Sequence, residues 1–180
     1  MGDRSLDDPE LEERRLRALR NVRQLGDPVL RTKASQIDVF DDALRAEAAQ
    51  MIELMHSARG VGLAAPQIGR LRQLIVIDPF EDEVPLALVN PDITWASDEE
   101  DSFDEGCLSI GEIVVPVVRP VAIRLTAQDV DGNPLELEME GFGARVVQHE
   151  VDHLNGILIL DRTTPEARKE ALRELRTGVA

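Results

Sequence analysis

The residues best suited to chemistry are two histidines that stand four positions apart around a glutamate. His149, Glu150 and His153 form the pattern H-E-x-x-H inside a segment with helical periodicity. Residues i and i+4 share one face of a helix, so both imidazoles can reach one metal ion, and the glutamate can reach water bound to that ion. The third histidine of the chain, His56, has no such pattern around it. The spacing therefore predicts a metal site with a carboxylate beside it.

A third protein ligand must come from elsewhere in the chain. Catalytic metal sites usually take three protein ligands and leave one position open for water. The residues offer Cys107 upstream, or a glutamate of the last segment, Glu170 or Glu174, in the manner of the zincin peptidases. A lone cysteine cannot form a disulfide within its chain, and by default it is a small buried apolar residue. The residues alone leave both candidates open.

Helices and strands that could position these residues follow from the spacing of the apolar side chains. The predicted helices are a charged one opening at Asp8-Pro9, an amphipathic one from Asp41 to before Gly60, one over 142–155 with both histidines, and a charged one over 164–176. The predicted strands are 73–78, 86–90, and a hairpin of 121–125 with 135–139 that turns at Asp131-Gly132.

The order of these elements indicates the fold class. Strands and helices do not alternate as they do in parallel-sheet proteins, so an α+β fold is expected. Antiparallel or mixed sheets would pack around the central helix with the two histidines, and a surface helix would lie at each end of the chain. Six of the eight residues over 98–105 are acidic, and this run is expected to be an exposed loop.

Composition bounds the organisation and the partners. A length of 180 residues suits one domain. We expect a charged extension over 1–20, a catalytic domain over 21–165, and a surface helix with a tail over 166–180. The formal net charge of −15 disfavours DNA and broad RNA binding. No apolar run approaches the roughly 18 residues of a membrane span, and the first residues lack the apolar core of a secretory signal, so a cytoplasmic protein is expected.

Three segments resemble the peptide deformylases, in the order and at the separations found in that family. They are GVGLAAPQ at 60–67, EGCLS at 105–109 and QHEVDHLNG at 148–156. The likeness runs from about Val22 to Asp161. It implies removal of the N-formyl group from the methionine of newly made proteins, with release of formate. It also implies nascent formylmethionyl chains as partners, at the ribosome.

The resemblance also assigns roles to residues. The implied metal ligands are Cys107, His149 and His153, which would hold one divalent ion, iron(II) in the first place, with zinc, nickel or cobalt as substitutes. Glu150 would take a proton from the attacking water and return it to the leaving amine. The Gln67 side-chain amide and the Leu108 backbone N–H would donate hydrogen bonds to the developing oxyanion.

Substrate contacts are implied as well. The backbone of Val61 and Gly62 would pair with the substrate peptide like an added strand. The full set expected to contact the substrate is Val61, Gly62, Glu105, Gly106, Phe142 and Val146, the last two lining a methionine pocket. Many bacterial members have a proline two residues after EGCLS and a substrate-binding arginine further on, whereas this chain has the run 110–114, IGEIV. Peptide preference beyond methionine is therefore left open.

Two other functions, a silent family member and a dinucleotide-binding protein, fit the sequence less well. A catalytically silent family member with a structural metal would usually lose Glu150 or Gln67, and this chain keeps both. Residues 60–65 match the dinucleotide-binding pattern G-x-G-x-x-A, but a predicted helix precedes them where that fingerprint requires a strand.

Overall fold

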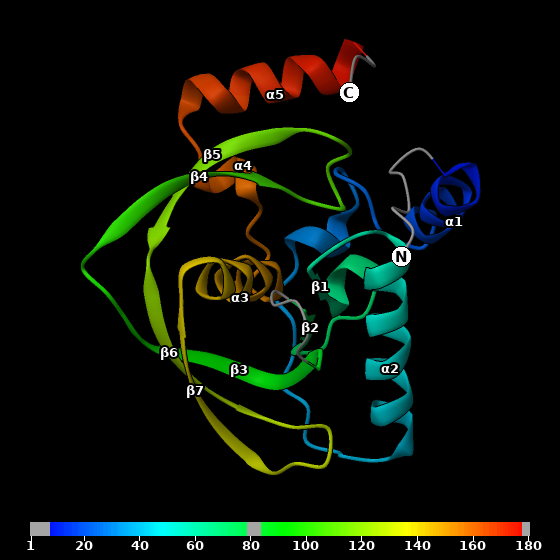
Figure 1. Ribbon diagram of the computed structural model, residues 1–180, viewed down its shortest axis with the longest axis vertical. Coiled ribbons are helices and arrows are strands. Elements are labelled where there is room, and N and C mark those ends of the chain that lie inside the picture. Colours follow the sequence, from blue (N-terminus) through cyan, green and yellow to red (C-terminus); the bar gives the residue numbers. More distant parts are fainter. Residues whose placement is uncertain (1–7, 79–83, 178–180) are drawn as a thin grey trace, which may run out of the picture.

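Helix α3 (Gly141–Leu154), which carries both histidines of the H-E-x-x-H pattern, lies at the centre of the molecule. The structure is a computed structural model that describes residues 8–78 and 84–177. A five-stranded sheet passes along one side of α3 and a two-stranded sheet along the other, and the first and last helices of the chain lie outside them (Figure 1). The predicted α+β fold with sheets around this helix is confirmed.

Both sheets are antiparallel throughout their ladders. The larger sheet has the order β1-β2-β3-β6-β7, with β1 at an edge. Its strands are β1 (Gly62–Ala64), β2 (Leu74–Ile77), β3 (Leu86–Ala96), β6 (Ala122–Gln128) and β7 (Pro134–Glu140). The smaller sheet is the hairpin of β4 (Glu100–Gly106) and β5 (Val114–Pro120). The predicted hairpin around Asp131-Gly132 is the β6–β7 pair.

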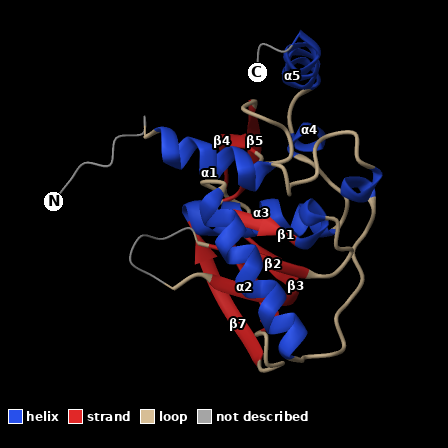
Figure 2. Cartoon of the chain, turned by 90° about the vertical axis from the view of Figure 1, so that its right-hand side faces the viewer, coloured by secondary structure: helices blue, strands red, loops and turns tan. Residues whose placement is uncertain are grey.

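Aspartate side chains cap the N-termini of some of the helices. The other helices are α1 (Pro9–Leu19), α2 (Asp42–Ser57), α4 (Ile159–Arg162), α5 (Pro165–Thr177), and the short 3₁₀ helices η1 (Pro28–Arg31) and η2 (Ala65–Ile68). The Asp8 carboxylate accepts from the Glu10 N–H at 3.0 Å, and that of Asp41 from the Leu44 N–H at 2.9 Å. Helix α1 lies beside one end of α2 (Figure 2). A search of the described helices finds none that is long and apolar enough to cross a lipid bilayer.

Strand β2 forms the middle of the core because both of its faces are covered. All four residues of this strand are fully buried. Successive side chains of a strand point to opposite faces, so Ile75 and Ile77 join the apolar cluster of α3, whereas Leu74 and Val76 join the cluster of α2. An unbroken apolar run in a strand thus reflects helices on both sides of the sheet.

Most of the acidic run over 98–105 is a strand, from Glu100 onward, and not the loop that its composition suggests. Strand β4 pairs along its whole length with β5. Its side chains are exposed except that of Glu105, so the expected exposure is correct for the others. The β4–β5 ladder satisfies the backbone of these residues, while their charged side chains remain in solvent. A strand whose side chains are almost all solvated, with few apolar residues, gives no alternation for a sequence pattern to detect.

Strand β3 continues past the proline that was expected to end it. The predicted strand covers 86–90, but β3 extends to Ala96. Pro91 lies where the pairing with β6 shifts in register between Val89 and Asp92. A proline is tolerated inside a sheet at such an irregularity because no ladder hydrogen bond is required of it there.

Gly156 ends the helix of the histidines, as its place after 142–155 predicts. Its φ is +73°, and its N–H donates to the carbonyl of His153 at 3.1 Å. A Cβ at this position would lie 2.7 Å from the backbone oxygen of Arg31. Both the left-handed conformation and the close approach of a second chain segment therefore favour glycine.

Comparison of Gly156 with Gly111 separates the cost of the left-handed conformation from the cost of the close approach. Gly111 also has a positive φ, of +69°, but nothing lies within 4 Å of a Cβ built there. Gly111→Ala should lower the free energy of unfolding by about 1–2 kcal/mol, the cost of the left-handed conformation. Gly156→Ala should lower it further because the Arg31 backbone must move. Urea unfolding of both variants measures the difference, and equal losses would contradict the packing argument.

Candidate active site

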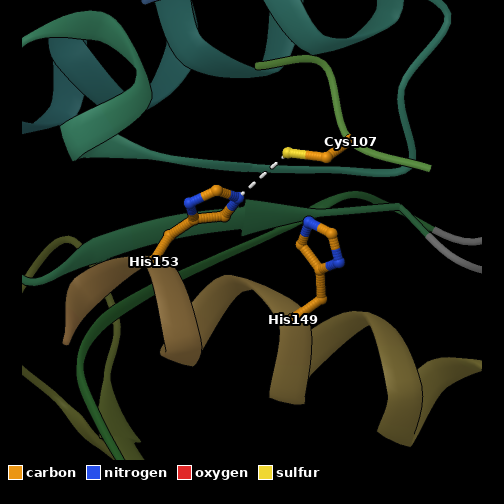
Figure 3. A group of neighbouring side chains, drawn as sticks. All are labelled: Cys107, His149 and His153. Carbon is orange, nitrogen blue, oxygen red and sulfur yellow. Dashed lines mark hydrogen bonds between the residues drawn. The ribbon is translucent and has the colours of Figure 1, made fainter. Parts of the chain in front are cut away.

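Three candidate metal ligands meet on one side of α3. Cys107, His149 and His153 each offer one ligand atom, and these atoms lie within 4.8 Å of one another. The two imidazoles extend from α3 toward Cys107, which follows β4, and Cys107 Sγ is 3.3 Å from His153 Nε2 (Figure 3). One thiolate and two imidazoles form a donor set that suits divalent transition metals. The donor set and its convergence therefore fit a metal ion.

The protonation of the histidines bears on this fit, because only a neutral imidazole can bind a metal. Burial, together with the nearby His149 and Arg119, lowers the pKa of His153 well below 6.5. Burial also acts to lower the pKa of His149, but hydrogen bonds with Cys107 and Glu105 outweigh it and raise that pKa well above 6.5. His153 is thus ready to bind, whereas a metal ion must displace a proton from His149.

A buried ion cluster joins α3 to the β4–β5 hairpin. The carboxylate of Glu105 accepts hydrogen bonds from Arg119 Nε at 2.6 Å, Arg119 Nη2 at 3.0 Å, Arg145 Nη1 at 2.7 Å and His149 Nδ1 at 3.0 Å. Burial acts to raise the pKa of Glu105, but these partners outweigh it and lower the pKa to about 2. Glu105 therefore stays ionised and holds His149 by Nδ1, which leaves Nε2 free to bind a metal.

Asp152 extends this arrangement on the other side of Arg119. Its carboxylate accepts from Arg119 Nη1 at 2.8 Å and from Arg162 Nε at 3.0 Å. We call this set of five residues the Glu105 cluster: Glu105, Arg119, Arg145, Asp152 and Arg162. Arg119, Arg145, Asp152 and Arg162 were not predicted from sequence as part of the site. One signal was available for Arg119, since it continues the inward alternation of Val115 and Val117 on β5.

Glu150 is enclosed beside the ligands and can exchange a proton at neutral pH. Its side chain is buried, and burial raises its pKa to about 7. None of the described residues donates a hydrogen bond to its Oε2. A Cβ on Gly62 would lie 2.4 Å from Glu150 Oε1, so the carboxylate occupies the space in front of this glycine. A carboxyl group with a pKa near 7 suits both proton uptake and proton return.

Gln67 is held with its amide nitrogen toward the ligands. Its Oε1 accepts from the Ala64 N–H at 2.8 Å, and its Nε2 donates to Ser109 Oγ at 3.2 Å and lies 3.7 Å from Cys107 Sγ. Ser109 is fully buried, and its place in EGCLS was the signal for a role that the sequence alone did not assign. The Leu108 N–H has no acceptor within the described ranges. Two neutral donors therefore adjoin the cysteine.

A cleft of about 930 Å³ opens onto these groups. All of the residues predicted to contact substrate line it: Val61, Gly62, Glu105, Gly106, Phe142 and Val146. Residues of α1 line it too, which the sequence did not predict.

Along one wall of the cleft runs the edge strand β1, where the Val61 carbonyl accepts from the Asp78 N–H at 2.8 Å. Because backbone groups alternate along a strand, the N–H and C=O of Gly62 point to the open edge.

The family follows from comparison with known proteins. The sequence profile described as polypeptide deformylase matches residues 19–169. The chain belongs to the polypeptide deformylase family. The peptide deformylase of Dictyoglomus thermophilum is 48% identical over 151 residues, which cover 84% of this chain and 97% of that protein.

Solved deformylase structures have the same fold. The crystal structure of Arabidopsis thaliana peptide deformylase 1B in complex with an inhibitor has a TM-score of 0.83 at 38% identity, over 87% of this chain and 88% of that one. The peptide deformylase of Synechococcus elongatus in complex with actinonin gives 0.82 at 42% identity, over 87% and 86%. The predicted enzyme class is confirmed, and the Cys-His-His triad of a deformylase is present.

The glutamates that a zincin-type site would use lie away from the two histidines. Glu170 and Glu174 belong to α5, which packs against β5, and α5 lies beyond the β4–β5 hairpin from α3 in both views (Figures 1 and 2). Within 8–78 and 84–177, the ligand cluster around the two histidines includes Cys107 and neither glutamate. The third ligand of this deformylase site is the cysteine.

Glu105→Gln tests the outer partner of His149. The amide has the same volume but lacks the charge that holds the Nδ1 proton, so metal affinity should fall by about 10- to 100-fold. Competition with a chromophoric chelator measures the affinity. Asp104→Asn is the matched control, since it removes the same charge from the neighbouring exposed position and should bind metal as the parent does. If both variants bind equally well, Glu105 does not orient His149.

Proposed function

We propose that this chain hydrolyses the N-formyl group of the methionine that begins nascent polypeptides, at the ribosome in the cytoplasm, and releases formate. The observation that supports this most directly is the triad of Cys107, His149 and His153 beside the buried carboxyl group of Glu150. Membership of the deformylase family gives the reaction class, and the cleft that opens onto these residues supports the roles proposed for them.

Cys107, His149 and His153 would hold one divalent ion, which we propose to be iron(II), with zinc, nickel or cobalt as substitutes. Their sulfur and nitrogen donors are accepted by all four metals. When bound, the ion supplies a Lewis acid that lowers the pKa of water and polarises the formyl carbonyl.

Glu150 is proposed as the general base and acid. It takes the proton from water as the water attacks the formyl carbon, and it then returns that proton to the amine that leaves. A pKa of about 7 supports both steps, since the carboxylate and the acid are both accessible near neutral pH. Burial maintains this pKa, and Gly62 leaves room for the carboxylate at the edge strand.

Gln67 and Leu108 are proposed as the oxyanion donors. The Gln67 Nε2 and the Leu108 N–H flank Cys107 and carry no net charge that would compete with the metal. Ala64 and Ser109 fix the Gln67 amide before substrate arrives, so no reorganisation is needed as charge develops on the formyl oxygen.

The substrate peptide is proposed to add to the edge of β1. Its backbone would run alongside Val61 and Gly62, where the N–H and C=O of Gly62 point to the open edge and are available for an additional strand. Phe142 and Val146 of α3 would line the methionine pocket, with Gly106 opposite them. A flexible thioether side chain suits such an apolar pocket.

Glu150→Gln tests the assigned proton transfer. The amide is nearly isosteric but has no basicity, so formate release from formyl-Met-Ala should fall by at least 10²–10⁴-fold while the metal content stays the same. Formate is measured by a coupled dehydrogenase assay, and metal by elemental analysis. A variant that keeps its metal and works within tenfold of the parent would remove Glu150 from this role. A parent that releases no formate would indicate a silent family member.

The identity of the third ligand is tested with Cys107→Ser and Glu174→Gln. A serine hydroxyl stays protonated and binds divalent metals poorly, so Cys107→Ser should lose most of its bound metal. Glu174→Gln should keep one ion per chain. Metal per chain, measured on both variants purified side by side without oxygen, decides between the two. The opposite result would assign the site to the zincin type.

A further inference from the structure

Helix α1 forms the outer wall of the substrate cleft. Three of its residues and its C-cap line the same cavity as His149 and Glu150, namely Arg15, Leu16 and Leu19 with the C-cap Arg20. The family profile begins to match only at residue 19, so almost all of α1 precedes the shared domain. A segment that composition assigned to a charged extension thus contributes side chains to the site.

This helix is anchored at both rims of the cleft. Arg14 Nε donates to Ser57 Oγ of α2 at 3.0 Å, and Arg15 Nη2 donates to Glu112 Oε1 at 3.3 Å in the loop after β4. Ala18 is buried between them. One contact to α2 and one to the loop after β4 thus place α1 along the cleft.

The segment after α1 is tied to the two proposed oxyanion donors. The Arg23 N–H donates to the Gln67 carbonyl at 2.7 Å, and the Leu25 N–H donates to the Ser109 carbonyl at 2.8 Å. Between them, Gln24 Nε2 donates to the Leu108 carbonyl at 3.1 Å. The segment that follows α1 is therefore bonded directly to the two loops that carry Gln67 and Leu108.

The side chains that α1 itself presents to the cleft are apolar or cationic, while Asp104 and Glu112 line other parts of it. Leu16 is 51% exposed, although it faces the cleft. Arg20 lines both this cleft and a second hollow of about 600 Å³, which Arg70 also lines. In the described part of the chain, neither Arg20 nor Arg70 has a carboxylate within 4 Å. In a protein with a net charge of −15, Arg20 thus places a guanidinium group without such a partner at the substrate cleft.

We propose that α1 selects among substrates, with Arg20 favouring nascent chains that carry acidic side chains after the formylmethionine. This inference rests on the proposed function and adds a specificity determinant to it. The substrate would lie along β1 with its formyl group at the metal ligands, and its later residues would pass the cationic wall. A carboxylate there meets a guanidinium, whereas an ammonium group is repelled.

The test compares two peptides on the full-length, metal-loaded protein. Formyl-Met-Ala-Glu-Glu-Ser and formyl-Met-Ala-Lys-Lys-Ser differ only in the charge of the residues that pass α1. The parent should show a kcat/KM about three- to fivefold higher for the acidic peptide, the effect of one partly screened ion pair. Arg20→Gln should bring the ratio close to one, mainly by raising KM for the acidic peptide, and Arg20→Glu should invert it.

Arg17→Gln is the matched control. It removes the same charge from the same helix, but Arg17 is exposed and pairs with Glu13 away from the cleft. Its ratio should equal that of the parent. Equal kcat/KM for both peptides in the parent, or equal ratios in Arg17→Gln and Arg20→Gln, would overturn the inference and leave the proposed function intact. Absence of formate release from both peptides and from formyl-Met-Ala would overturn the proposed function and the inference with it.

Discussion

The ion pairs that Arg119 and Glu105 of the β4–β5 hairpin make with Asp152 and Arg145 of α3 hold together the two elements that must supply one metal site. Cys107 comes from the end of a strand and the histidines from a helix, so the triad exists only while α3 and the β4–β5 hairpin keep their relative position. Arg119 on β5 binds Glu105 on β4 and Asp152 on α3 at once. Buried charges are costly unless they are paired with good geometry, and here each carboxylate has several charge-assisted hydrogen bonds.

Glu105 also connects that scaffold to the chemistry. It stands two residues before Cys107, and its carboxylate fixes the Nδ1 of His149. One short segment therefore supplies a metal ligand and orients another. On the opposite wall, Ala64 and Gly62 of β1 play a comparable part, since one fixes Gln67 and the other leaves space for Glu150. The groups proposed to react are therefore carried by, or directly follow, elements of the core.

The parts of the structure that depend on local spacing could be predicted from the sequence. The H-E-x-x-H pattern places both imidazoles on one helix face, and Gly156 ends that helix, because both features lie within a few turns of the chain. The ligand Cys107 is some forty residues away, and the residues alone left it as one candidate beside Glu170 and Glu174, so that only resemblance to a family selected it. Strand β4 was missed because its stability comes from pairing with β5 and not from any periodicity of its own acidic residues.

The buried ion pairs between residues far apart in the chain were the hardest feature to predict from the sequence. Arg145 and Asp152 read as ordinary charged residues of a helix, and their burial becomes understandable only when β4 and β5 lie against α3. The contribution of α1 to the cleft has the same origin. Its thin apolar stripe indicates a solvated helix, and only the anchoring of Arg14 and Arg15 to other segments shows where it lies.

The Glu105 cluster gives this protein a particular response to heat. The hydration of ions becomes less favourable as temperature rises, so the cost of keeping Glu105, Arg119 and Asp152 out of water declines on warming. Helix α1 is held instead by partly exposed pairs and by one buried alanine, and such contacts contribute little to stability. Heating should therefore release the outer wall of the cleft first, so that discrimination among substrates disappears at a lower temperature than the metal centre does.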